Sequence, residues 1–264
     1  MTNRLHAALA KSENTPLIGA ACYFYDPIFL EMAILMGFKV IWIEMEHGHI
    51  TFAEAADLCR MAAGHDVLTM IRIADTRREN ILKACECGPD MIDVPMVDTP
   101  ETAAELVHFA RYPTEGGRGA FGISRSLRYG LVDSLAEAQK QLNEELSLLV
   151  QIETKEALAR VDEIAAVPNV DIFIGPADLA ASLGLAGQTA HAEVQAACTR
   201  IVESAKRHGK KVVTACAPAD FPFWAKLGID VLFAINDISA LRAGAKVALD
   251  AAKKAIAEQG SGAA

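Results

Sequence analysis

The sequence lacks a long apolar run, a basic cluster and a disulfide framework, and each absence excludes a class of protein. No run approaches the ~20 apolar residues that span a bilayer, and no apolar segment follows the N-terminus as in a signal peptide. A formal net charge of −9 without clustered Lys and Arg excludes nucleic acid and anionic membrane surfaces as partners. Six cysteines in 264 residues are too few for a disulfide scaffold. We therefore expect a soluble, cytoplasmic protein with reduced thiols.

The sequence has an apolar fraction of 52%, which is enough for a large core. Short apolar runs alternate with Ala-rich amphipathic stretches, and the runs are nearly continuous in hydrophobicity, which indicates strands buried on both faces of a parallel sheet. We expect strands at residues 17–21, 40–43, 67–71, 91–94, 148–152, 171–174, 211–215 and 231–235. We expect helices at residues 28–36, 52–63, 79–87, 101–110, 157–166, 193–208, 221–227 and 241–258.

Eight strand–helix units in about 250 residues are typical of a (β/α)8 barrel. An open doubly wound sheet fits the alternation too, but the glycine-rich phosphate loop that usually follows its first strand is absent. We therefore predict an α/β fold, a single-domain TIM barrel over residues 1–259, with a flexible C-terminal tail over residues 260–264. The irregular stretch at residues 111–133 is long enough to indicate a functional loop.

Charged residues follow several of the predicted strands, at the rim where barrel enzymes carry their active sites. An unpaired charge beside an apolar strand is costly, so their convergence on one rim indicates a site. They are Glu44, Glu46, His47, Arg72, Glu153, Asp178 and Asp237.

Two of these carboxylates, Glu153 and Asp178, follow neighbouring predicted strands and should lie side by side. Hard divalent cations such as Mg²⁺ and Mn²⁺ prefer oxygen ligands, with water in the remaining positions. An equally good interpretation pairs the two acids with nearby arginines or makes Asp178 a helix cap.

Arg72 and His47 have two interpretations each. The planar guanidinium of Arg72 suits a substrate carboxylate, but a structural salt bridge to Glu44 or Glu46 explains it equally well. His47 suits acid–base catalysis near neutral pH, with these carboxylates to orient its ring. A lone histidine is more often a polar packing residue.

Lysine positions disfavour a Schiff-base aldolase, which needs a lysine on an inner strand position. Lys39, Lys210 and Lys211 stand at the starts of predicted strands, on the opposite rim. This placement leaves a metal as the electron sink.

Six short motifs occur along the chain in this order: Glu46-His47-Gly48, Ile71-Arg72, Val94-Pro-Met-Val97, Gly117-Arg-Gly119, Gln151-Ile-Glu-Thr154 and Ile174-Gly-Pro-Ala-Asp-Leu179. Together they resemble the HpcH/HpaI aldolase family, the metal-dependent class II pyruvate aldolases. The resemblance implies a (β/α)8 barrel that reversibly cleaves a 4-hydroxy-2-oxo acid to pyruvate and an aldehyde, with Mg²⁺, Mn²⁺ or Co²⁺ as cofactor. It also implies a homo-oligomer, often a hexamer built as a trimer of dimers, with the last helix exchanged between partners.

The resemblance implies a role for each matching residue. Glu153 and Asp178 match the metal ligands, and Arg72 matches the arginine that contacts pyruvate and its enolate. His47 matches the acid–base histidine, which acts either directly or through a metal-bound water. Gln151 lies where a glutamine lines the site.

Glu44 and Glu86 depart from the family pattern. Glu44 stands where many members have an aspartate that supports the histidine, and Glu86 stands where a neighbouring subunit usually contributes an aspartate. Both keep the charge, so the departures affect substrate identity more than reaction type. We also expect the backbone N–H groups of Ala177 and Asp178 to hold the substrate carboxylate.

Two alternative functions stay open. An acyl-CoA lyase of the malyl- or citramalyl-CoA type needs a basic patch for nucleotide phosphates, and the loop arginines Arg118, Arg125 and Arg128 are its nearest match. The same arginines suit the distal end of an acidic aldehyde, a solvated loop or a subunit contact. The second alternative is a catalytically silent barrel that binds metal and pyruvate.

Overall fold

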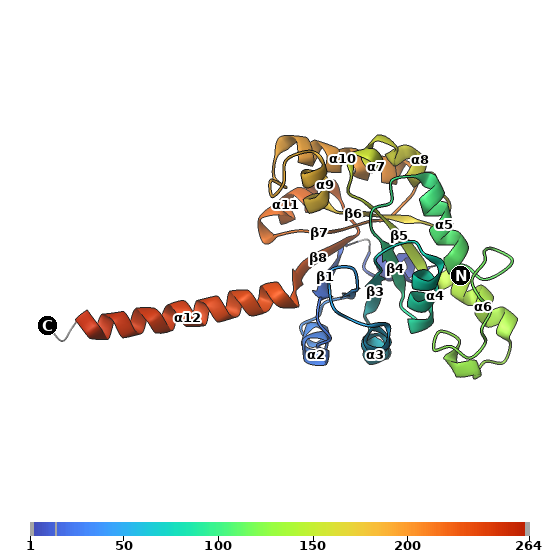
Figure 1. The fold of residues 1–264 in the computed structure, drawn as a ribbon, viewed down its shortest axis with the longest axis horizontal. Helices are drawn as coiled ribbons and strands as arrows, with labels where there is room; N and C mark the ends of the chain where they lie inside the picture. Colours follow the sequence, from blue (N-terminus) through green and yellow to red (C-terminus); the bar gives the residue numbers. More distant parts are fainter. Residues whose placement is uncertain (1–2, 14, 262–264) are drawn as a thin grey trace.

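Eight parallel strands form a closed barrel in the order β1 to β8, and β8 pairs with β1 (Figure 1). The structure is a computed structural model that describes residues 3–13 and 15–261. Every strand lies within one residue of its predicted bounds, so the predicted TIM barrel is confirmed. The strands are β1 (Leu17–Cys22), β2 (Val40–Glu44), β3 (Leu68–Arg72), β4 (Met91–Val94), β5 (Ser147–Ile152), β6 (Asp171–Ile174), β7 (Val212–Ala215) and β8 (Val231–Asn236).

Helices surround the barrel, and most of them match the predicted ranges. The helix expected at residues 157–166 is divided into two short ones. Three α-helices, α1, α6 and α9, and the short 3-10 helices η1 and η2 were not predicted. The helices are α1 (Arg4–Lys11), α2 (Pro27–Leu35), α3 (Phe52–Ala62), α4 (Arg78–Cys87), α5 (Pro100–Ala110), η1 (Arg128–Gly130), α6 (Leu135–Glu145), α7 (Lys155–Ala159), α8 (Val161–Ala165), α9 (Pro176–Ser182), α10 (Ala192–Arg207), η2 (Pro218–Asp220), α11 (Phe221–Leu227) and α12 (Asp237–Ser261).

Helix α1 closes the N-terminal end of the barrel. Its buried residues Leu5 and Leu9 belong to the same apolar cluster as the side chains that fill the barrel interior. Arg4 is paired with Asp90 at 2.7 Å, which fixes the helix to the start of β4. With this end plugged, the C-terminal ends of the strands remain as the open rim.

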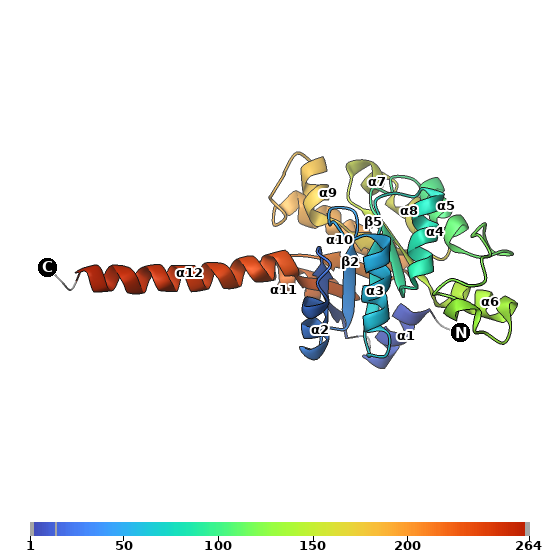
Figure 2. The same ribbon diagram turned by 60° about the horizontal axis from the view of Figure 1, so that its bottom comes forward.

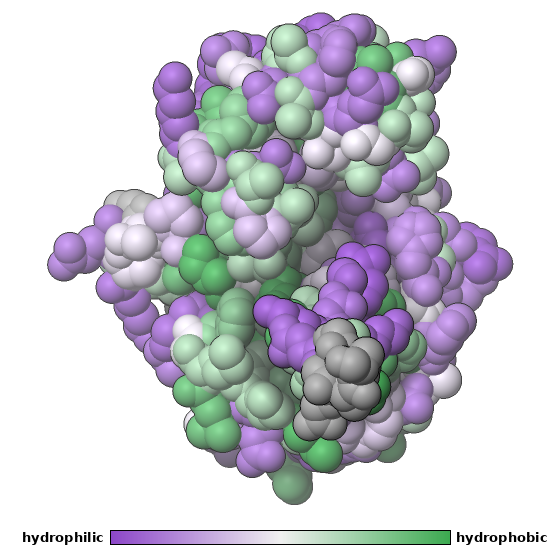
Figure 3. Space-filling view, turned by 90° about the vertical axis from the view of Figure 1, so that its left-hand side faces the viewer, coloured by the Kyte–Doolittle hydropathy of each residue, from purple (hydrophilic) through white to green (hydrophobic). Residues whose placement is uncertain are grey.

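Helix α12 projects far from the barrel, as both ribbon views show (Figures 1 and 2). It begins four residues before the predicted range and continues through Ser261. The helix therefore includes the first two residues of the predicted tail, and residues 262–264 lie outside the described residues. Leu241, Leu249 and Ile256 on this helix are exposed. Apolar side chains also gather on the lower part of the face from which α12 emerges (Figure 3).

None of the helices among residues 3–13 and 15–261 combines the length and apolarity needed to cross a membrane.

Candidate active site

The barrel interior changes from apolar to polar at the C-terminal ends of its strands. Glu44 ends β2, Arg72 ends β3, and Gln151 and Glu153 lie at the end of β5. Two residues earlier in each of these three strands is an apolar side chain of the interior cluster: Trp42, Met70 and Leu149. Because side chains alternate between the two faces of a strand, all four point into the barrel.

One continuous chain of contacts joins these four residues. Arg72 Nε donates to Glu44 Oε2 at 2.6 Å, and Arg72 Nη1 donates to Gln151 Oε1 at 3.5 Å. Gln151 Nε2 in turn donates to Glu153 Oε2 at 2.5 Å. Glu46 adds a second carboxylate, with Oε2 3.2 Å from Arg72 Nη1. The network thus links β2, β3 and β5 across the barrel.

Arg72 is buried but keeps its charge. Burial by itself lowers the pKa of a guanidinium, but Glu44, Asp93 and Glu46 outweigh burial and raise the pKa of Arg72. The guanidinium also lies over the Trp42 ring, 4.7 Å from its centroid. Among the residues that the structure describes, none forms a hydrogen bond with Nη2, so this nitrogen is available to a ligand.

Backbone groups from two loops hold the Glu153 carboxylate. The N–H of Met96 donates to Glu153 Oε1 at 2.8 Å, and Met96 adopts a left-handed backbone conformation at φ 54°. Gly175 passes so close that a Cβ there would meet Glu153 Oε2 and Gln151 Nε2. The strained turn and the glycine therefore shape a cradle around this one carboxylate.

Burial and the nearby Asp178 raise the pKa of Glu153 to about 7, against the hydrogen bonds from Met96 and Gln151. Asp178 is exposed on the first turn of α9. Two hard carboxylates that repel each other suit a divalent cation, and Mg²⁺ is often held by only one or two carboxylates plus water and substrate. No group of three or more His, Cys, Asp or Glu that would hold a metal forms within residues 3–13 and 15–261.

The start of α9 supplies free backbone donors beside Asp178. The first intrahelical hydrogen bond runs from the Leu179 N–H to the Gly175 carbonyl, so the N–H groups of Ala177 and Asp178 precede the helical ladder. No described residue accepts from either group. They are the two N–H groups that we expect to hold the substrate carboxylate.

His47 lies at the exposed edge of the network. Its Nε2 is 3.8 Å from Glu46 Oε2, whereas Glu44 Oε1 accepts the backbone N–H groups of Glu46 and His47 at 2.7 and 2.9 Å. Glu44 therefore fixes the turn that carries the histidine, and its carboxylate does not contact the imidazole. Burial raises the pKa of Glu46, although Arg72 and His47 oppose the shift.

Comparison with known proteins identifies the family. The profile of the HpcH/HpaI aldolase/citrate lyase family matches residues 24–220, which is most of the chain. The chain belongs to this family. A 5-keto-4-deoxy-D-glucarate aldolase from Klebsiella pneumoniae is 33% identical over 254 residues, covering 96% of this chain and 97% of the relative. A hydroxypyruvate/pyruvate aldolase from Sagittula stellata is 39% identical over 196 residues, covering 74% and 76%.

Solved structures agree with the family assignment. The HpcH/HpaI aldolase from Desulfitobacterium hafniense superposes with a TM-score of 0.86 at 27% identity, covering 92% of this chain and 95% of the other. With relatives that are aldolases, this HpcH/HpaI family member is a lyase of the aldolase type and a class II aldolase.

One predicted site residue of the aldolase, Glu86, lies away from the others within the chain. It stands near the C-terminal end of α4 and accepts a hydrogen bond from Arg118 Nη2 at 3.2 Å. Arg125 donates to the carbonyls of Cys87 and Cys59, at the ends of α4 and α3. These helix ends precede β4 and β3, so the arginine-containing loop lies at the N-terminal end of the barrel, opposite the charged rim.

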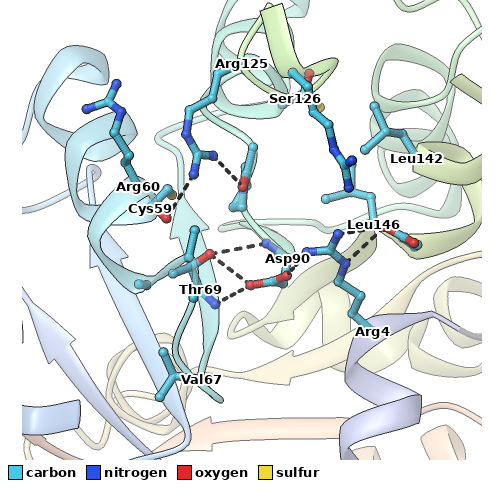
Figure 4. Close-up of a pocket in the computed structure, with 18 of the residues that line it drawn as sticks. Arg4, Cys59, Arg60, Val67, Thr69, Asp90, Arg125, Ser126, Leu142 and Leu146 are labelled. Carbon is cyan, nitrogen blue, oxygen red and sulfur yellow. Dashed lines mark hydrogen bonds and ion pairs between the residues drawn. The ribbon is translucent and has the colours of Figure 1, made fainter. Parts of the chain in front are cut away.

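A cavity of about 690 Å³ lies at this opposite end, between the loop and the ends of α3 and α4 (Figure 4). Its central charges are already paired: Asp90 accepts from Arg4 and from the Thr69 N–H, both at 2.7 Å. Asp237 has a similar internal role at the other rim, where it accepts the N–H groups of Tyr23 and Phe24. The carboxylates of Asp90 and Asp237 are thus both engaged by the chain itself.

One carboxyl group of the aldolase site, Asp93, had no predicted role, although a charged residue in the otherwise apolar strand β4 was a visible signal. The salt bridges from Arg72 to Glu44 and Glu46, which the sequence left open as an alternative, are both present.

Proposed function

We propose that this aldolase is divalent-metal-dependent and reversibly cleaves a 4-hydroxy-2-oxo acid to pyruvate and an aldehyde. The contact chain from Glu153 through Gln151 to Arg72 carries the proposal, because it sets a carboxylate suited to a cation beside a guanidinium with a free Nη2. In this proposal Glu153 and Asp178 hold the cation, which when bound polarises the keto group of the substrate as a Lewis acid.

The chain's own residues supply the other steps. Arg72 stabilises the negative charge that develops on the keto oxygen as the C3–C4 bond breaks. The N–H groups of Ala177 and Asp178 bind the substrate carboxylate at the start of α9. His47, oriented by Glu46, accepts the proton of the C4 hydroxyl group. The names of the two relatives, a hydroxypyruvate/pyruvate aldolase and a 5-keto-4-deoxy-D-glucarate aldolase, support a 2-oxo acid.

Exchange of the pyruvate methyl protons with deuterium tests this proposal without the natural aldehyde. We expect exchange by NMR in the presence of Mn²⁺ or Mg²⁺, and a fall of more than about 100-fold after treatment with EDTA, since the metal supplies several kcal/mol of charge stabilisation. Added metal should restore the rate. Exchange that survives exhaustive chelation contradicts the metal mechanism, and metal binding without exchange indicates a silent barrel.

The position of the basic loop favours a free 2-oxo acid over an acyl-CoA substrate. Recognition of CoA needs cations beside the reacting groups, but within one chain Arg118 and Arg125 contact Glu86 and helix-end carbonyls at the opposite end of the barrel.

We also propose that the protein is a homo-oligomer, with the hexamer as the expected form. By the 3.6-residue repeat, Leu241, Leu249 and Ile256 share one side of α12 with Ala245 and Ala252. The three large side chains are exposed, and no element of the described chain covers them. A second copy of the barrel suits this stripe. In such an assembly Glu86 is the residue expected to reach a neighbouring site.

Leu249→Glu is expected to lower the oligomeric state, because it places a charge in the apolar stripe of α12. The matched control is Ala243→Glu, which adds the same charge on another side of the same helix. Light scattering coupled to gel filtration measures both masses. A monomeric wild type, or equal masses for wild type and Leu249→Glu, contradicts the proposed interface.

A further inference from the structure

Asp93 is a buried carboxyl group that the proposed reaction does not use. Met91 on β4 belongs to the interior cluster, and Ile92 and Val94 pack under the helices, so strand alternation turns Asp93 into the barrel. Its side chain is fully buried, and neither carboxyl oxygen has a hydrogen-bond partner among the residues that the structure describes. Buried polar atoms are nearly always paired, so this exception requires an explanation.

The charged groups that face Asp93 come from its neighbouring strands and their ends. Arg72 on β3 is its direct partner in the strand register, and its partner on β5 is apolar. Glu153 at the end of β5, Glu44 on β2 and Glu46 after β2 add negative charge. Burial, opposed by Arg72 and reinforced by these carboxylates, raises the pKa of Asp93 well above its usual range. A fully buried carboxyl group without a hydrogen-bond partner favours its neutral form, so the metal-free protein favours the protonated form of Asp93.

A divalent cation at Glu153 and Asp178 changes this balance, because it cancels the negative charge that opposes ionisation of Asp93. We propose that Asp93 is a positioning residue for Arg72, which releases its proton when a divalent cation binds and then supports the guanidinium as an anion. The O–H bond of the carboxyl group breaks, and the proton passes to the solvent. Arg72 is then held from both neighbouring strands, by Glu44 on β2 and by Asp93 on β4. The inference rests on the metal site of the proposed function.

Counting the protons released by Mn²⁺ tests the inference. Calorimetric titration of the metal-free protein at neutral pH, in buffers of different ionisation enthalpy, is expected to show about one proton fewer for Asp93→Asn than for wild type. Asp171→Asn is the matched control, because it removes another buried aspartate at the start of β6 and should release as many protons as wild type. The kcat of Asp93→Asn should fall about tenfold with little change in KM. Loss of a group that orients a substrate-contacting residue, here Arg72, typically has an effect of this size.

Unfolding of the metal-free protein gives a second readout, with a fixed sign. The native state keeps the Asp93 proton to a higher pH than the unfolded chain does, so the stabilisation is complete at low pH and is lost as the pH rises. As the pH rises above about 4, the ordinary pKa of an aspartate, the urea midpoint of wild type should fall more steeply than that of Asp93→Asn. If Asp93→Asn fails to fold, infrared spectroscopy of wild type replaces it. The absorption band of a protonated carboxyl group should then disappear when Mn²⁺ is added.

The outcomes separate the inference from the function on which it rests. Mn²⁺ binding with equal proton counts and parallel urea midpoints overturns the role of Asp93, and a purely structural residue predicts that result. A wild type that binds no Mn²⁺ overturns the metal site of the proposed function as well. One proton fewer in Asp93→Asn, together with an unchanged Asp171→Asn, supports the inference.

Discussion

Glu153→Gln is expected to lower kcat/KM for retro-aldol cleavage by about 1000-fold or more, since even partners of metal ligands typically account for 10- to 100-fold. Glutamine has nearly the same shape and still accepts the Met96 N–H through its amide oxygen. It lacks the negative charge, however, and leaves Asp178 as the remaining one of the two proposed ligands. Mn²⁺ titration should show a matching loss of affinity.

The stability of Glu153→Gln should not fall with its activity. Burial and Asp178 raise the pKa of the native carboxyl group to about 7, so the folded protein already pays for this charge. Glu145→Gln is the matched control, because it neutralises a carboxylate that is paired with Arg4 at the opposite end of the barrel. A Glu153→Gln protein that keeps EDTA-sensitive turnover within tenfold of wild type contradicts the assignment of Glu153 as a ligand.

The barrel was predictable because strands buried on both faces produce short, continuous apolar runs, such as Val40–Glu44 up to its final residue. Three helices escaped this pattern for physical reasons. Helix α6 buries only Asn143, α1 is two turns long with two buried leucines, and α9 is a seven-residue helix. Elements that are this short, or that bury so few side chains, are fixed by caps and tertiary contacts, such as Ser134, which caps α6.

The candidate site was predictable only to the level of which residues reach the rim. Position at a strand end identified Arg72 and Glu153, but Arg72 and Gln151 are 79 positions apart and meet only because the barrel closes. Because of the turn after β2, Glu44 accepts backbone N–H groups, and the imidazole of His47 lies near Glu46 instead. No one-dimensional pattern contains these choices, because each depends on where a neighbouring strand places its partner.

Arg72→Lys is expected to lower kcat by about 100- to 1000-fold, the range seen when one donor to a developing oxyanion is removed. A single ammonium group cannot donate to Glu44 as Nε does and also offer a second nitrogen to the substrate. Steady-state kinetics and pyruvate deuterium exchange should fall together. Retention of turnover within tenfold contradicts a role for Arg72 in stabilising the reacting oxygen.

Arg72→Ala separates this catalytic loss from a loss of stability. Without the guanidinium, Glu44 is a fully buried carboxylate that keeps only backbone donors, and breaking a buried pair costs about 3–5 kcal/mol. Adding Glu44→Gln removes the unpaired charge while its amide oxygen still accepts those N–H groups. The double variant should therefore regain most of the urea stability of wild type and none of its activity. Recovery of activity together with stability would show that Arg72 serves only to neutralise Glu44.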